Sequence, residues 1–250
     1  MDENRKNEFK EDIPAPVSIK LSEKAENFWY HYKWHTIAAI IIVIIVTVCT
    51  IQMCQKESYD AYILYAGSHE VKKTSSDGST PPYAQTVSSL KRVSDDFNKN
   101  GEITINLKDL FLLTADEIKK VESETGLEVN YTLISENSQL LKDSVVYSEY
   151  YLCFLSKDIY EQYKIIDGVY IFKDLSEYVS AYDVDMYDSS ALYLSSTEFY
   201  TLPGISDFPE DTVVCIRNIS PIASHWDKDG SEAGFAAAEA ILKKIIAYQN

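Results

Sequence analysis

The sequence predicts a protein of the α/β class, in which one N-terminal transmembrane helix precedes an outer domain with a mixed or partly parallel sheet flanked by helices. Three observations lead to this prediction. Residues 36–54 carry no charged side chain and are long enough to cross a bilayer. After them, β-prone apolar runs alternate with amphipathic segments. The run YYLCFL at 150–155 is continuously apolar, as expected of a central strand that is buried on both faces.

Composition limits the classes of function. The 250 residues are 46% apolar with only 8 Gly and 7 Pro, which excludes a wholly disordered chain. The formal net charge is −16, and residues 1–35 hold 6 basic and 7 acidic side chains, so almost all of the excess lies beyond them. Because an acidic surface repels phosphate backbones, nucleic acid is not an expected partner.

Residues 36–54 are predicted to form a permanent membrane anchor. These 19 residues span about 28 Å as a helix, the thickness of a hydrocarbon core. A core helix would show a polar stripe, and Ile37–Val46 shows none. A cleaved signal would start its apolar region near the first residue and end in small residues, unlike Gln52-Met53-Cys54. The lipid bilayer is therefore the first expected partner.

The flanking lysines predict the orientation of this anchor. Lys20, Lys24 and Lys33 precede it, whereas Lys56 alone follows closely. Positive charge collects on the cytoplasmic side, so the N-terminus is expected in the cytoplasm and the C-terminal domain outside, in a single-pass protein of the cell membrane. The expected divisions are a cytoplasmic tail with an aromatic juxtamembrane segment, a transmembrane helix and an extracytoplasmic α/β domain, at 1–35, 36–54 and 55–250.

The outer domain is predicted to begin with a strand, a loop and a helix. The β-rich run 61–66 ends at Gly67 and is followed by a polar loop at 72–80. Thr80 can cap a helix opened by two prolines, and Asn100-Gly101 can stop it. Its apolar residues recur at helical spacing: Tyr83, Val87, Leu90 and Phe97.

The next segments predict a strand and a helix, then a second strand and helix. Alternation at 103–107, continued by FLLT at 111–114, indicates a strand. Thr114 and Glu117 have capping-box spacing, which predicts a helix over 117–123 that Gly126 ends. Residues 127–133 are interpreted as a strand. Ser135 is expected to cap the helix that follows, whose apolar residues are Leu140, Leu141 and Val145.

The last elements follow the central strand at 150–155. Ser156 is expected to cap a short helix at 157–163, and TVVCIRN at 212–218 reads as a strand. The final helix is expected to start at Ser231 as its N-cap. Its apolar face is formed by Phe235, Ala238, Leu242 and Ile245. Cys153 and Cys215 fall in predicted strands, where they either pack as small apolar side chains or form a bridge if the strands are neighbours.

Residues 140–179 carry a resemblance to a known family, which covers residues 58–217 loosely. The segment 167–178, DGVYIFKDLSEY, follows a helix, a buried strand and a short helix, as in a lobe of the extracellular solute-binding proteins of ABC importers. The whole layout is also similar to small single-pass membrane proteins of anaerobic Gram-positive bacteria. The resemblance implies a periplasmic-binding-protein-like lobe and a binding or sensing function.

The chain shows no motif typical of an enzyme or a cofactor site. Ser88-Ser-Leu-Lys91 matches S-x-x-K without the companion motifs, and no G-x-S-x-G, P-loop or dinucleotide fingerprint occurs. His31 and His35 lack a third metal ligand. The acidic runs 183–188 and 227–232 lack the spacing of a calcium loop. Neither an enzyme activity, a cofactor nor a metal is therefore expected.

The general behaviour of open α/β sheets predicts the ligand site. Ligands bind at the carboxyl ends of strands, where loops lead into helix N-termini. Tyr65, Ser68 and His69 after the first strand, and Ser156 after the central one, are the expected ligand-binding residues. The acidic surface favours a neutral or cationic small molecule. The alternative is a non-catalytic accessory subunit whose outer domain docks on a membrane complex such as an ABC permease.

Overall fold

The computed structural model describes residues 21–54, 59–71, 82–126, 128–147, 149–221, 225 and 227–249. The chain divides into two compact units, Met1–Glu57 and Ser58–Asn250. The predicted loop at 72–80, with Thr80 as a helix cap, lies outside the described residues.

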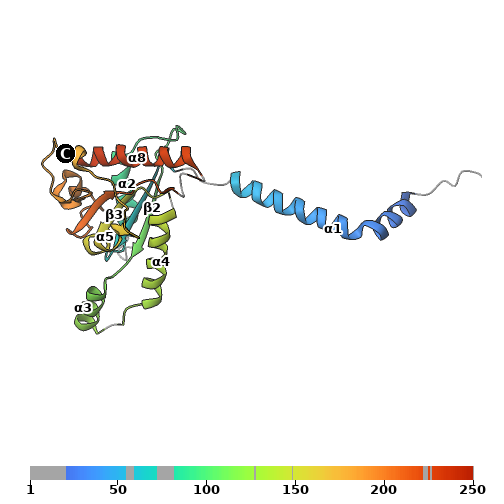
Figure 1. Cartoon of the computed structure of the whole chain (residues 1–250), viewed down its shortest axis with the longest axis horizontal. Helices are drawn as coiled ribbons and strands as arrows, with labels where there is room; N and C mark the ends of the chain where they lie inside the picture. The colour runs from blue at the N-terminus through green and yellow to red at the C-terminus, as the bar shows by residue number, and fades with distance from the viewer. Residues whose placement is uncertain are drawn as a thin grey trace, which may run out of the picture. The chain divides into compact units, whose positions relative to one another are not determined.

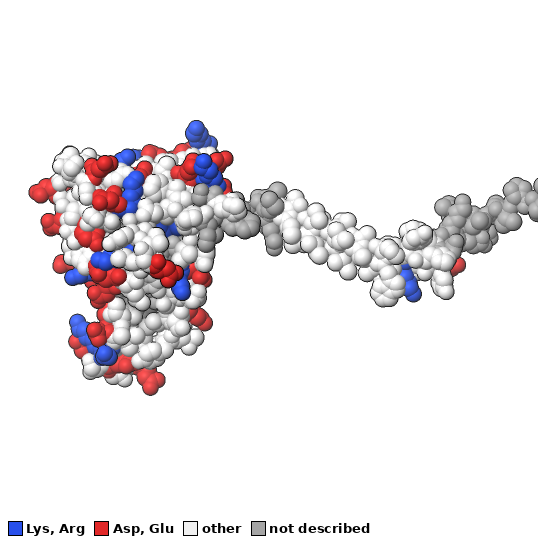
Figure 2. All heavy atoms as spheres, viewed as in Figure 1, with Lys and Arg blue, Asp and Glu red and all other residues white. Residues whose placement is uncertain are grey.

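The first unit contains one long helix, α1, over Leu21–Cys54. Its segment Phe28–Ile51, 24 residues, is long and apolar enough to cross a membrane, and none of it is buried inside the chain. The hydroxyl groups of Thr36, Thr47 and Thr50 donate to carbonyls four residues earlier, at 2.7–3.0 Å, which satisfies them without water. Figure 2 shows an uncharged surface along the C-terminal half of this helix. The prediction of one N-terminal apolar helix is confirmed, and the aromatic residues at 28–34 belong to the same helix.

The second unit is built on a six-stranded mixed sheet in the order β2-β1-β3-β8-β7-β6. β1 pairs in parallel with β2 and β3, whereas β8, β7 and β6 join in antiparallel pairs. The strands are β1 (Ala61–Gly67), β2 (Ile105–Phe111), β3 (Leu152–Ser156), β6 (Met186–Asp188), β7 (Ala191–Tyr193) and β8 (Thr212–Ile216). A separate two-stranded hairpin is formed by β4 (Ile165–Ile166) and β5 (Val169–Tyr170). The predicted α/β class with a partly parallel sheet is confirmed.

Helices cover both faces of this sheet (Figure 1). α2 and α8 pack on one face, and α4 and α5 pack on the other. α3 has no buried residue and lies beyond the N-terminal end of α4. The helices are α2 (Pro82–Val93), α3 (Ala115–Thr125), α4 (Tyr131–Tyr147), α5 (Lys157–Tyr163), α6 (Ser176–Val179) and α8 (Lys228–Ile246), with 3-10 turns η1 (Leu194–Ser196) and η2 (Glu198–Thr201).

Strand β3 lies at the centre of the core. All five of its residues are buried, because alternate side chains enter the two hydrophobic clusters on opposite faces of the sheet. Leu152 and Phe154 face α2 and α8, whereas Cys153 and Leu155 face α4 and α5. The prediction of a central strand at 150–155 is confirmed, with a parallel neighbour on one side and an antiparallel neighbour on the other.

Cys153 and Cys215 lie directly opposite each other on β3 and β8. Both are fully buried and both are free thiols. Burial raises the pKa of the Cys215 thiol well above its ordinary value, so this group stays protonated. Of the two predicted alternatives, the structure has the pair of small buried side chains.

The predicted strand at 127–133 is wrong. Leu127 lies outside the described residues, 128–130 form no regular element, and α4 begins at Tyr131 rather than after Ser135. The Asn130 side chain accepts a hydrogen bond from the Leu133 N–H at 3.1 Å, as a helix cap does. The β-prone composition was overridden by this cap.

The capping box of Thr114 and Glu117 is confirmed, as is the helix end at Gly126, although α3 starts two residues before the predicted range.

Helix α2 ends at Val93, earlier than the predicted stop at Asn100-Gly101. Buried Asp60 accepts hydrogen bonds from the backbone N–H groups of Asn98 and Thr104, at 2.9 and 2.7 Å. The Asp60 carboxylate therefore holds the segment after α2 against the start of β1. Phe97 therefore packs on the core from outside the helix.

The final helix begins four residues earlier than predicted. Asp227 is the N-cap of α8 and accepts from the Gly230 N–H at 3.0 Å, whereas the predicted cap, Ser231, is buried within the first turns. The predicted apolar face is confirmed for Ala238, Leu242 and Ile245, which are buried against the sheet.

Among the glycines that the structure describes, Gly204 is predicted to be the least tolerant of a side chain. It has φ +76°, and an added Cβ would lie 2.5 Å from the backbone nitrogen of Thr86 in α2. Gly204→Ala is therefore expected to lower the free energy of unfolding by about 2 kcal/mol more than Gly101→Ala. Gly101 is the matched control, because it also has a positive φ but open space around it. Chemical denaturation of the full chain measures both, and equal losses would contradict the packing of the 202–205 segment on α2.

Candidate functional site

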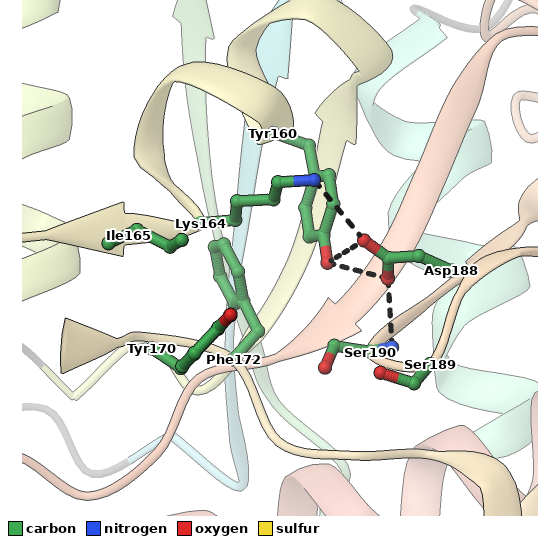
Figure 3. Close-up of a pocket in the computed structure, with 8 residues that line it drawn as sticks. All are labelled: Tyr160, Lys164, Ile165, Tyr170, Phe172, Asp188, Ser189 and Ser190. Atoms are coloured by element: carbon green, nitrogen blue, oxygen red, sulfur yellow. Dashed lines mark hydrogen bonds and ion pairs between the residues drawn. The ribbon is translucent and has the colours of Figure 1, made fainter. Parts of the chain in front are cut away.

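A pocket of about 250 Å³ lies on the α4/α5 side of the sheet (Figure 3). Its walls come from the end of α5, the β4–β5 hairpin and the turn between β6 and β7. The lining residues are Tyr160, Lys164, Ile165, Tyr170, Phe172, Asp188, Ser189 and Ser190. Aromatic and aliphatic side chains stand on one side of the opening, and Asp188 with the two serines stands on the other.

The hairpin wall is fixed by local sequence and by pairing with β8. Asp167 and Gly168 both have positive φ, 51° and 78°, which turns the chain sharply between β4 and β5. After β5 the chain runs beside the end of β8, where Phe172 bridges to Arg217 and the Lys173 N–H donates to the Ile216 carbonyl at 2.8 Å. The DGVYIFK segment therefore forms a hairpin followed by an edge contact with the sheet.

Asp188 is the polar centre of the pocket. The Tyr160 hydroxyl donates to its two carboxylate oxygens at 2.8 and 3.0 Å, and the Ser190 N–H donates to Oδ1 at 2.8 Å. Lys164 Nζ lies 3.6 Å from Oδ2 and donates to Glu161 Oε1 at 2.7 Å. The β6–β7 turn is thus tied to both α5 and its own backbone.

The electrostatics of the pocket follow from these contacts. Burial, followed by the hydrogen bond to Asp188, raises the pKa of Tyr160 far above its ordinary value, so its hydroxyl remains a donor. The hydrogen bond from Lys164 lowers the pKa of Glu161, and the same bond raises the pKa of Lys164. The Lys164 ammonium therefore lies between the carboxyl groups of Glu161 and Asp188, and of these two Asp188 lines the pocket.

The apolar side of the pocket is formed by rings. Phe172 is buried and stacks on Tyr160 with the ring centroids 5.1 Å apart. Tyr170 is 70% exposed and stands at the mouth together with half-exposed Ile165. A ligand that entered would gain burial on these faces without displacing a packed side chain.

The structure brings together three of the four ligand-binding residues predicted from sequence, Tyr65, His69 and Ser156. They lie outside the pocket described above. The Tyr65 hydroxyl accepts from the His69 N–H at 3.1 Å. A Cβ built on Gly67 would lie 2.6 Å from the Tyr65 hydroxyl and 3.5 Å from Ser156 Cβ, so Ser156 lies beside them. Ser68 follows Gly67 and is half-buried. The assignment of these residues to a ligand stays a prediction.

Tyr65 packs in the core rather than facing a described cavity. It is fully buried, and its ring centroid lies 4.7 Å from that of Phe208, which also contacts His69. Burial raises the pKa of Tyr65, and the nearby Asp109 and Asp211 raise it further. Ser156 occupies the N-cap position of α5 as predicted, but its side chain makes no capping bond.

The residues around Tyr65 and the pocket around Asp188 lie on opposite faces of the sheet and at opposite ends of its strands. Tyr65 belongs to the cluster facing α2 and α8, at the carboxyl end of β1. In the pocket, the turn before β7 lies near the start of β3, because Ala191 and Cys153 both pair with Cys215. The rule that ligands gather at carboxyl ends does not lead to this turn. In the sequence, Asp188 belongs to the acidic run 183–188, which is interpreted as a solvated turn. The aromatic residues at 160 and 170 lie too far from it in the sequence to suggest a shared site.

Nothing in the described residues assembles a familiar catalytic or metal centre. Lys108 Nζ donates to Ser144 Oγ at 2.7 Å, a Ser–Lys arrangement, but the Ser144 hydroxyl donates to the Leu140 carbonyl at 2.6 Å and points its proton away from the lysine. No group of three His, Cys, Asp or Glu side chains that could hold a metal occurs among the described residues. Within the two acidic runs, Asp188 binds Tyr160 and Asp227 caps α8.

The Thr212 hydroxyl allows a test of the structure at the carboxyl end of β3, where Ser156 lies. The two residues face each other across β3 and β8, and neither hydroxyl has a hydrogen-bond partner within the described part of the protein. A buried hydroxyl without a partner is destabilising, so Thr212→Val is expected to raise the free energy of unfolding by about 1 kcal/mol.

Thr86→Val is the matched control for this change. Thr86 is equally buried, but its hydroxyl donates to the Gly204 carbonyl at 3.1 Å, so the same substitution should cost about 1 kcal/mol. Thermal and chemical denaturation of the full chain measure both. A loss of stability in Thr212→Val would contradict this expectation and show that the hydroxyl is hydrogen-bonded in solution.

Comparisons with known proteins add no assignment to this geometry. No family model, curated protein or solved structure matches the chain.

Proposed function

We propose that this chain is a membrane-anchored extracytoplasmic module, solute-binding-protein-like in its outer domain, that binds or senses a small molecule. The observation that carries the proposal is the pocket on Tyr160, Tyr170 and Asp188, which combines exposed ring faces with a few fixed polar groups. This combination is typical of small-molecule sites. The helix that precedes the domain, Phe28–Ile51, supports an anchor in the lipid bilayer.

The charge of the chain supports the class of ligand. Carboxylates outnumber basic groups by 39 to 23, and on the face seen in Figure 2 the two signs are interspersed without a continuous basic patch. Such a surface favours neutral or cationic ligands over anionic ones and gives no support to a nucleic-acid partner.

A second candidate function rests on exposed apolar side chains. Tyr131, Leu133 and Leu140 of α4 are exposed, and α3 buries none of its residues. Exposed apolar groups of this kind favour an accessory subunit that docks on another membrane protein, such as an ABC permease. Under this alternative, Tyr131→Ser with Leu140→Ser would abolish co-purification of the partner, and the pocket would bind nothing.

A ligand screen of the full chain tests the binding function. Sugars, amino acids, short peptides and polyamines are each added at millimolar concentration, and the melting temperature is measured. A ligand at ten times its Kd adds about 1.4 kcal/mol, which raises the melting temperature by about 3–6 °C for a domain of this size. We expect at least one class to give such a shift. A screen without any shift would favour the docking subunit.

Cysteine labelling of intact cells tests the orientation. In a background of Cys49→Ser and Cys54→Ser, the remaining Cys153 and Cys215 are buried and should not react. Ser88→Cys, at an exposed position of α2, is expected to react with a membrane-impermeant maleimide, because the lysines before the span favour an outer domain outside the cell.

Asn4→Cys in the N-terminal tail is the control for this labelling. It should react only after the cells are lysed. Labelling of Asn4→Cys in intact cells, with Ser88→Cys protected, would reverse the proposed topology.

A further inference from the structure

The polar groups of the pocket restrict the charge of its ligand. Lys164 Nζ donates to Glu161 at 2.7 Å, and its 3.6 Å separation from Asp188 is longer than a hydrogen bond, so an ammonium N–H remains for a ligand. A cation would be repelled by this ammonium. An anion would be repelled by the carboxylate of Asp188, which lines the pocket beside Lys164. A ligand without net charge avoids both penalties.

The same groups require a ligand that both donates and accepts. Asp188 Oδ1 already accepts two hydrogen bonds, from Tyr160 and Ser190, whereas Oδ2 accepts one from Tyr160 and keeps room for a further donor. Lys164 beside it can only donate. Two adjacent hydroxyl groups on one ligand fit this pair, because a hydroxyl accepts from the ammonium and its neighbour donates to the carboxylate.

The opposite wall and the volume define the rest of the ligand. The rings of Tyr170 and Phe172 lie across the opening from Asp188 (Figure 3), and Tyr170 is the exposed ring of the two. The volume of about 250 Å³ is below the ~300–1,000 Å³ typical of sites for drug-sized ligands, so it fits a single ring. A ring with a C–H face on one side and hydroxyl groups at its edge matches both walls.

We propose that this pocket binds a neutral polyhydroxylated ring, a monosaccharide or a cyclitol, with its C–H face on Tyr170 and adjacent hydroxyl groups between Asp188 and Lys164. The inference rests on the proposed binding function and narrows its ligand to one chemical class. Tyr170 holds the ligand by stacking, and Lys164 selects against cations.

Saturation-transfer NMR titrations of the full chain test this proposal. The chain is kept in a polyoxyethylene detergent, since sugar-headed detergents would compete. The neutral probes are D-glucose, D-galactose, D-mannose and myo-inositol, which separate a sugar from a cyclitol. The charged probes are choline, putrescine and D-glucuronate. We expect at least one neutral probe to bind more tightly than every charged one.

Two variants place the binding in the pocket. Tyr170→Ala is expected to weaken the neutral probe about 3- to 10-fold, the loss of one stacking contact. Tyr182→Ala, another exposed tyrosine outside the pocket, should leave it unchanged. Lys164→Met keeps the aliphatic stem and removes the ammonium, so it should weaken the neutral probe and strengthen choline at least about threefold. Both side chains are exposed or partly exposed, so folding is not at stake, and melting curves check this.

Three results would overturn the proposal. Tightest binding of a charged probe that Tyr170→Ala abolishes would refute the neutral ring and leave the binding function standing. Neutral binding that is equal in Tyr170→Ala and Tyr182→Ala would refute the pocket as its place. Absence of binding by every probe would refute the neutral ring, and the wider ligand screen would then decide whether the binding function fails as well.

Discussion

The outer domain depends on the burial of strand β3 between two different neighbours. All five residues of Leu152–Ser156 are buried, with β1 parallel on one side and β8 antiparallel on the other. A strand that is covered on both faces needs helices in both layers, and the α2/α8 and α4/α5 pairs provide them. The junction also divides the sheet into a parallel half that ends at β2 and an antiparallel half that ends at β6.

The pocket is a consequence of this junction. Helix α5 leaves the end of β3 and returns over the sheet, carrying Tyr160 and Lys164 toward the start of the strand. The antiparallel half brings Asp188 to the same place from 28 residues further along the chain. Hydrogen bonds between Tyr160 and Asp188 join α5 to the turn between β6 and β7. The pocket therefore lies where α5, which follows the parallel strand β3, meets the antiparallel half of the sheet.

Sequence patterns predicted the elements whose signals are local. The capping box at Thr114, the continuous apolar run of β3 and the apolar face of α8 were correct because each needs only neighbouring residues. The strand expected at 127–133 failed because one cap, Asn130, outweighs β-propensity. The short strands β6 and β7 were missed, since three residues give no periodicity. The pocket was missed because its residues lie apart in the sequence and meet through tertiary contacts, which include the Tyr160–Asp188 hydrogen bonds and the pairing of β7 with β8.

Hydrogen exchange of the full chain, followed residue by residue, tests the role of β3 most directly. If this strand joins both halves into one cooperative unit, the amides of β1, β3 and β8 will exchange only through global unfolding, with one common free energy. The β4–β5 hairpin and α3 will exchange faster, because their residues are largely exposed or half-buried. Exchange of β8 and β7 at a clearly lower free energy than β1 and β3 would contradict the account, since the antiparallel half would then open independently of the strand that is proposed to hold it.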